Sequence, residues 1–141
     1  MWREQVGAVY AAWNGRDLDR ALQVAHPDIV VRQDPATPGA FEGVGRQALR
    51  AWLEGFFETW EEFRITLERV VERGDRVVVV AHIHARGRSS GVEVENRVGH
   101  VHTMHDGLIV RLETYASPAA ALRAAGVPEE PPPTPPRTAR R

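Results

Sequence analysis

At 141 residues and 43% hydrophobic content, the chain has the size of one domain with a single hydrophobic core. Its formal net charge of −1 argues against nucleic acid or an acidic membrane as the main partner, because both bind basic surfaces. The absence of cysteine excludes disulfides and thiolate metal sites. No apolar segment approaches the roughly 20 residues of a membrane span. Residues 1–10 lack the apolar core of a signal peptide, so we expect a cytoplasmic protein.

The first predicted elements are helices. Over residues 2–14, apolar side chains recur at the spacing of an amphipathic helix. They are Val6, Val9, Tyr10 and Trp13. Asp17 is placed to cap a second, short helix that runs to residue 25.

A short β-branched strand is predicted over residues 28–33, followed by a proline- and glycine-rich loop over 34–45. Residues 46–60 give the clearest helix, because apolar side chains form a broad stripe along it. The stripe consists of Leu49, Trp52, Leu53, Phe56 and Trp60.

Beyond residue 60 the apolar residues alternate with polar ones, which is typical of strands. The predicted strands lie around residues 63–67 and over 76–86, 92–105 and 108–115. Asp106-Gly107, between the last two strands, predicts a type I′ hairpin turn.

A last short helix is predicted over residues 118–125, with Gly126 at its end. From residue 128 the sequence is proline-rich and charged, which predicts a disordered or polyproline tail after a folded domain of residues 1–127. Helices in the N-terminal half and antiparallel strands in the C-terminal half predict an α+β fold.

Short motifs mark the junctions of these elements. They are YAAWNGRDLD at 10–19, HPD at 26–28, FEG at 41–43, GDRV at 74–77, the hairpin at 102–110 and AALRAAG at 120–126. Their order and spacing resemble the NTF2-like superfamily and its SnoaL-like branch, with its polyketide cyclases and ketosteroid isomerase-like proteins. The resemblance implies an NTF2-like or cystatin-like cone, with three N-terminal helices packed on a strongly curved, mostly antiparallel sheet. It implies no single activity, because this fold carries isomerases, dehydratases, cyclases and non-enzymatic binders.

Asp34 is the first candidate for chemistry. It ends a predicted strand and precedes Pro35, and the ketosteroid isomerases carry a similar Asp-Pro there, whose Asp is the proton-shuttling base. A half-buried carboxylate suits proton abstraction next to a carbonyl. The alternative is that Asp34 only initiates a turn.

The match to the steroid isomerases is incomplete. Their first-helix Tyr falls on Val9 here, with Tyr10 one step around the helix. Their late-strand Asp falls on His100, and their third-helix Tyr on Leu53. Steroid isomerase activity itself is therefore not expected.

The histidines of the predicted strands are the second set of candidates. Alternation places His82 and His84 on the outer face, together with charged neighbours, whereas the isomerase alignment turns His100 and His102 inward. A neutral imidazole can relay protons or donate a hydrogen bond to an oxyanion. The alternatives are structural histidines and a zinc site. No carboxylate triad accompanies the histidines, and the related enzymes are metal-free, so we expect neither metal nor cofactor.

Two functions remain open for a pocket that takes a small apolar ligand. The first is cofactor-free acid/base catalysis on a carbonyl or hydroxyl compound, as an isomerase, dehydratase or cyclase, with Asp34 as base and His100 or His102 as acid or oxyanion donor. The second is a non-catalytic ligand-binding or dimerisation module.

Substrate-contacting residues are expected at Val9, Tyr10, Trp13, Trp52, Phe56 and Met104. By resemblance, we expect a homodimer through the outer face of the sheet.

Overall fold

The structure, a computed structural model, describes residues 3–128. Within this range, helices and strands follow one another in an order that confirms the predicted α+β class. They are α1 (Arg3–Asn14), α2 (Leu18–Gln23), β1 (Ala25–Gln33), β2 (Glu42–Val44), α3 (Arg46–Thr59), β3 (Trp60–Arg73), β4 (Arg76–Gly87), β5 (Glu93–His105), β6 (Leu108–Tyr115) and α4 (Pro118–Ala124). Residues 129–141, most of the predicted tail, lie outside the described part of the chain.

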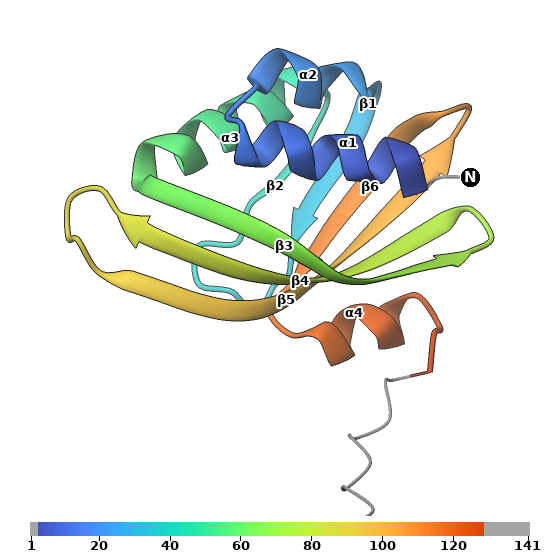
Figure 1. The fold of residues 1–141 in the computed structure, drawn as a ribbon. Coiled ribbons are helices and arrows are strands. Elements are labelled where there is room, and N and C mark those ends of the chain that lie inside the picture. Colours follow the sequence, from blue (N-terminus) through green and yellow to red (C-terminus); the bar gives the residue numbers. More distant parts are fainter. Residues whose placement is uncertain (1–2, 129–141) are drawn as a thin grey trace, which may run out of the picture.

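The strands form one curved sheet in the order β2-β1-β6-β5-β4-β3. Only the pairing of β1 with β6 is parallel. The helices α1, α2 and α3 lie on the concave side of the sheet, and α4 lies on the opposite side (Figure 1). The predicted arrangement of three N-terminal helices on a curved, mostly antiparallel sheet is confirmed.

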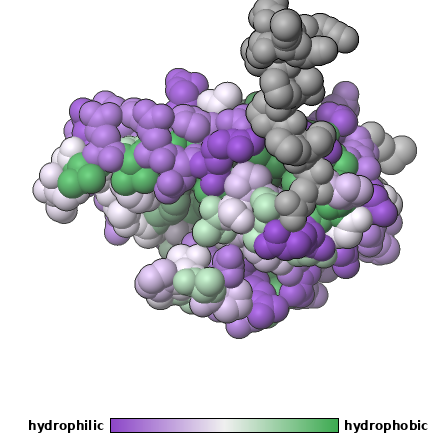
Figure 2. All heavy atoms as spheres, turned by 90° about the horizontal axis from the view of Figure 1, so that it is seen from below, coloured by the Kyte–Doolittle hydropathy of each residue, from purple (hydrophilic) through white to green (hydrophobic). Residues whose placement is uncertain are grey.

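Two hydrophobic cores lie on the two sides of the sheet. The larger one fills the concave side, between the first three helices and alternate residues of the strands, such as Val77, Val79 and Ala81. The smaller one lies under α4, where Leu122 packs with Val78. Viewed from below, the surface around α4 is mainly hydrophilic, with small hydrophobic areas between the polar residues (Figure 2).

Several boundaries differ from the sequence prediction. The predicted loop over 34–45 contains β2, which pairs only with β1, so its strand character depends on a partner that local sequence does not reveal. The first strand begins at Ala25, which pairs with Ile109 of β6. The helix predicted to residue 60 ends at Thr59, because Trp60 has an extended backbone and starts β3.

The predicted hairpin turn is confirmed. Asp106 and Gly107 have φ angles of 52° and 79°, and a type I′ turn requires positive φ at both central residues. No helix within residues 3–128 is both long enough and apolar enough to cross a membrane.

Candidate functional site

Three polar side chains meet in the concave core. The Tyr10 hydroxyl lies 2.7 Å from His100 Nδ1 and 2.9 Å from His102 Nε2. Their exposed fractions are 2% for Tyr10, 4% for His100 and 0% for His102. Tyr10 comes from α1, and the two histidines face the same side of β5 because side chains alternate along a strand. The predicted inward orientation of both imidazoles is confirmed.

Burial makes this cluster electrically neutral near pH 7. It lowers the pKa of His100 to about 4. The pKa of His102 falls to about 3, because of burial first and the nearby His100 second. Burial also raises the pKa of the Tyr10 hydroxyl well above its usual value. All three groups therefore act through hydrogen bonds rather than charge.

The hydroxyl has one hydrogen, so Tyr10 donates to one imidazole and accepts an N–H from the other. His102 Nδ1 is buried and has no hydrogen-bond partner among the described residues. If Tyr10 donates to His100, then His102 donates through Nε2 and its Nδ1 carries only a lone pair. The reverse arrangement would bury an unpaired N–H, and unpaired donors are rarer than unpaired acceptors in protein interiors. The favoured arrangement therefore leaves the hydrogen of His100 on Nε2.

A cavity of about 240 Å³ borders this cluster, and His100 is the member that lines it. One wall is aromatic. It consists of Trp13, Trp52, Phe56 and Phe63. Uncharged polar side chains also line the cavity. They include Gln33, Thr37, Asn96 and Thr114. An apolar cavity of roughly 150 Å³ binds benzene, so this one has room for a compound of one or two rings.

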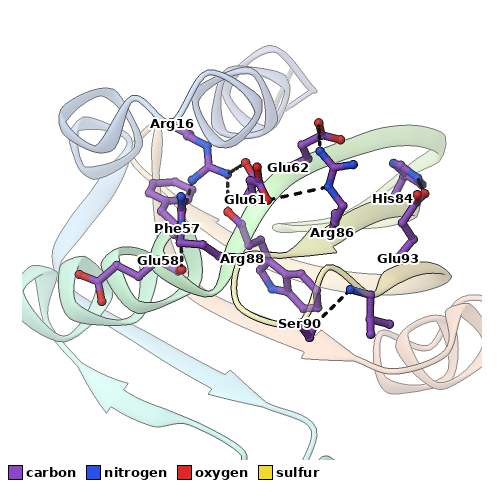
Figure 3. Close-up of polar contacts among 12 residues, drawn as sticks. Arg16, Phe57, Glu58, Glu61, Glu62, His84, Arg86, Arg88, Ser90 and Glu93 are labelled. Atoms are coloured by element: carbon purple, nitrogen blue, oxygen red, sulfur yellow. Dashed lines mark hydrogen bonds and ion pairs between the residues drawn. The ribbon is translucent and has the colours of Figure 1, made fainter.

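Two arginines hold the C-terminal end of α3, which carries much of the aromatic wall. Arg16 donates to the carbonyl oxygens of Phe57 and Trp60 at 2.8 and 2.6 Å. Arg88 donates to the carbonyl oxygen of Glu58 at 3.0 Å and also to that of Phe57, at 3.3 Å (Figure 3). The last carbonyls of a helix lack partners within the helix, and cations there also favour its dipole. The hydrogen bonds from Arg16 and Arg88 therefore fix the position of the aromatic wall of the cavity.

Asp34 lies beside the cavity without lining it. Its Oδ1 accepts the backbone N–H of Ala36 at 3.0 Å, and its backbone oxygen accepts the N–H of Thr37 at 2.8 Å. These contacts form a turn of the kind that Asp initiates. The neighbours Gln33 and Thr37 do line the cavity, so the backbone of Asp34 passes beside it. A catalytic role for Asp34 stays a prediction.

The predicted substrate contacts divide into two groups. Trp13, Trp52 and Phe56 line the cavity, and their contact with a substrate stays a prediction. Val9 borders a smaller internal void, and Tyr10 reaches the cavity only through its hydrogen bond to His100.

Met104 does not line the cavity. It is 2% exposed and lies two residues beyond His102, toward the β5–β6 hairpin, which removes it from the cavity end of the strand. His82 and His84 lie on the outer face as predicted, each paired with a glutamate.

Several cavity residues were missed by the sequence prediction. Asn96 and Val98 share the face of His100 on β5, so alternation was a sufficient signal for them. Thr114 lies directly opposite His100 on β6. That pairing depends on the strand register, which local sequence does not specify.

Within residues 3–128, no three His, Cys, Asp or Glu side chains are grouped to hold a metal ion. The two buried imidazoles instead share the Tyr10 hydroxyl. The arrangement offers hydrogen-bond recognition of an oxygen atom at the bottom of an aromatic cavity.

Residues 6–112 match the SnoaL-like domain family, and the chain belongs to that family. The resemblance noted from the sequence is thereby confirmed. No curated protein has significant sequence similarity to the chain.

Solved structures with the same fold include an NTF2-like protein of unknown function from Burkholderia pseudomallei, with a TM-score of 0.75 and 21% identity over 86% of this chain and 95% of that one. TerC, co-crystallized with polyporic acid, has a TM-score of 0.73 and 24% identity over 83% and 92%. A protein with a ketosteroid isomerase-like fold from Catenulispora acidiphila, in complex with trimethylamine, has a TM-score of 0.74 and 18% identity over 92% and 98%. At these identities the similarities establish the fold and not an activity.

Proposed function

We propose that this protein binds a small, largely apolar carbonyl or hydroxyl compound in the 240 Å³ cavity and catalyses a cofactor-free proton transfer on it. The reaction class is isomerisation, dehydration or cyclisation, which share proton abstraction next to a carbonyl. The observation that carries the proposal is the position of His100. This residue lines the cavity, and its Nδ1 is hydrogen-bonded to the Tyr10 hydroxyl.

In this proposal, His100 donates its Nε2 hydrogen to the substrate oxygen. A neutral imidazole suits this role because its hydrogen bond strengthens as negative charge develops on the oxygen, without a proton leaving the imidazole. With a pKa of about 4, His100 is too weakly basic to take up the proton efficiently near pH 7. A separate base is therefore needed.

We assign the base to Asp34, whose backbone passes beside the cavity. The carboxylate would take a proton from the carbon next to the substrate carbonyl, and the resulting enolate oxygen would receive the His100 hydrogen bond. The turn that holds Asp34 fixes its backbone beside the cavity residues Gln33 and Thr37.

Proton abstraction can be tested without knowing the natural substrate. We expect the protein to accelerate exchange of the α-protons of 2-tetralone in D₂O, followed by NMR. Asp34→Asn should reduce the acceleration by at least about 100-fold, the usual contribution of a general base. His100→Leu should reduce it as well. Asp75→Asn, in the exposed turn after β3, is the matched control and should behave like the wild type. An exchange rate no faster than in buffer would contradict catalysis.

A second candidate function is non-catalytic ligand binding. It is favoured by the cavity lining, which contains no Asp, Glu, Lys or Arg among the described residues. The complexes of TerC with polyporic acid and of the Catenulispora acidiphila protein with trimethylamine support small-molecule binding by this fold.

Fluorescence of Trp13 and Trp52 in the cavity wall provides the binding assay. Wild-type protein should bind 2-naphthol more tightly than naphthalene, and His100→Leu should remove that preference. Binding of 2-naphthol without exchange of 2-tetralone would favour the binder over the enzyme.

We also propose a homodimer through the outer face of β3, β4 and β5. This face carries both charge signs in neighbouring rows, including the pairs Arg86–Glu62 and Arg97–Glu68. Such a pattern allows self-complementary contacts between two copies. Sedimentation analysis at low and high salt tests it, and a monomer under both conditions would contradict it.

A further inference from the structure

Trp13 borders three separate spaces in the concave core. One is the 240 Å³ cavity that His100 lines. The other two are internal voids of about 20 Å³ each. Trp13 is shared by all three linings, so its indole is the partition between the cavity and the space behind it.

The void next to His102, here called the inner void, has an apolar lining. Besides Trp13 and His102 it is formed by aliphatic side chains. They include Val9, Ala25, Ile29, Leu53, Ile109 and Leu112. A void of this volume can hold one water, but a buried water needs two to four polar partners. The polar side chains of this lining are the indole and the imidazole, so a group that enters the inner void meets a largely apolar surface with few polar partners.

His102 supplies one polar atom at this end of the site. Its exposed fraction is 0%, and its Nδ1 is buried without a hydrogen-bond partner among the described residues. The favoured arrangement of the cluster leaves a lone pair on this nitrogen. It can therefore accept a hydrogen bond from a ligand hydroxyl.

The backbone of Trp13 is held in place, whereas its indole borders the cavity and two small voids. Adjacent to it, the Asn14 side chain makes two hydrogen bonds to the backbone of Ile65, at 2.9 and 2.8 Å, and these anchor the end of α1 to β3. The indole packs edge-on against Tyr10 and Trp52. A side chain next to empty space makes fewer dispersion contacts. The voids therefore leave the Trp13 indole less firmly held than the side chain of a fully packed residue.

We propose that the inner void is the deep end of the ligand site, and that Trp13 is the residue that decides how long a ligand the site accepts. When the indole turns aside, the cavity and the inner void join. The extended site takes a flat, apolar compound of two linked rings whose leading hydroxyl donates to His102 Nδ1. This proposal rests on the cavity being the ligand site.

The isoleucines provide reporters for both parts of the site. Ile83 lines the cavity, Ile29 and Ile109 line the inner void, and Ile65 lines neither. Methyl NMR of the full chain can therefore locate a bound compound without altering any of these residues.

In Trp13→Ala, we expect 4-phenylphenol to shift the methyl signals of Ile83, Ile29 and Ile109 and to leave Ile65 unchanged. Its affinity should rise about tenfold over the wild type, whereas the affinity of 2-naphthol, which fits the cavity alone and loses a wall contact, should not rise. The ¹⁵N signal of His102 Nδ1 should shift with 4-phenylphenol and not with biphenyl, which lacks the hydroxyl.

Trp52→Ala and Trp13→Phe complete the test. Trp52 lines the cavity and the other void but not the inner void, so its removal should not bring 4-phenylphenol to Ile29. Trp13→Phe opens the partition partly and keeps an aromatic ring if the alanine variant does not fold. A shift of Ile83 alone in the Trp13 variants would overturn the proposed deep end and leave the cavity as ligand site. If no reporter shifts with either phenol, both proposals fail.

Discussion

Two pairs of histidines occupy the two faces of the same sheet. His82 and His84 lie two residues apart on β4, and His100 and His102 lie two residues apart on the neighbouring β5. The outer pair is 37% and 38% exposed, and each imidazole lies within 3.2 Å of a glutamate oxygen. The inner pair is buried and shares one hydroxyl. The same residue type at the same spacing thus has different chemistry on each face.

The difference follows from solvation. Ion pairs on an exposed face gain little, because water and salt screen them. Figure 3 shows the contact between His84 and Glu93 among the charged contacts of the outer face. Both inner imidazoles are buried, so a hydrogen-bonding group that loses its partner there costs its full desolvation free energy. Changes to the inner pair should therefore have much larger effects than changes to the outer pair.

The largest expected effect is a loss of stability in acid. The unfolded chain protonates these histidines near their usual pKa of 6.5, whereas the folded state keeps His100 neutral to about 4 and His102 to about 3. The free energy of unfolding should therefore fall as the pH drops below about 6.5, on the order of 3 kcal/mol for His100 alone by about pH 4. Urea denaturation between pH 7 and pH 4 measures this loss. Protonation of either inner imidazole between pH 6 and 7, observed by NMR, would contradict it.

Next in size is Tyr10→Phe. The variant keeps the ring and leaves both His100 Nδ1 and His102 Nε2 without their partner. We expect a loss of about 2–4 kcal/mol in the free energy of unfolding, since each unsatisfied buried group costs about 1–3 kcal/mol. The control is Tyr115→Phe, whose hydroxyl lies 3.5 Å from Glu113 in a half-buried position. Equal stability of the two variants would show that the inner hydrogen bonds do not matter.

Gly99→Ala tests the outer face where α4 covers it. An added Cβ would collide with Ala121 Cβ and lie 3.2 Å from the Ser117 oxygen. We expect a loss of about 1–3 kcal/mol in the free energy of unfolding, typical of overpacking. Gly7→Ala in α1, where a Cβ meets no atom within 4 Å, is the control and should gain about 0.5–1 kcal/mol. An unchanged stability of Gly99→Ala would mean that α4 shifts freely on the sheet.

The smallest effect is expected for the outer pair. Replacing both His82 and His84 by Gln should change the free energy of unfolding at pH 7 by less than about 1 kcal/mol, because exposed polar contacts contribute little. A loss as large as that of Tyr10→Phe would refute the contrast between the two faces.

The sequence determined the order of most elements and the face of most strand residues. Alternation was enough to turn His82 and His84 outward. Asp106-Gly107 specified its turn because a type I′ hairpin needs residues that tolerate positive φ. The helical stripe of α3 likewise identified Trp52 and Phe56 as inward-facing. These features depend on local periodicity, which can be read directly from the amino-acid sequence.

Only the tertiary structure decided the chemistry of the site. The Tyr10 hydroxyl lies between two imidazoles that are 90 and 92 residues away in sequence, and this contact depends on how α1 crosses the sheet. The cavity depends on how completely the aromatic side chains fill the concave core, and Trp13 lines both the cavity and the inner void. Distant contacts and unfilled volume are properties of packing, so no local pattern of residues specifies them.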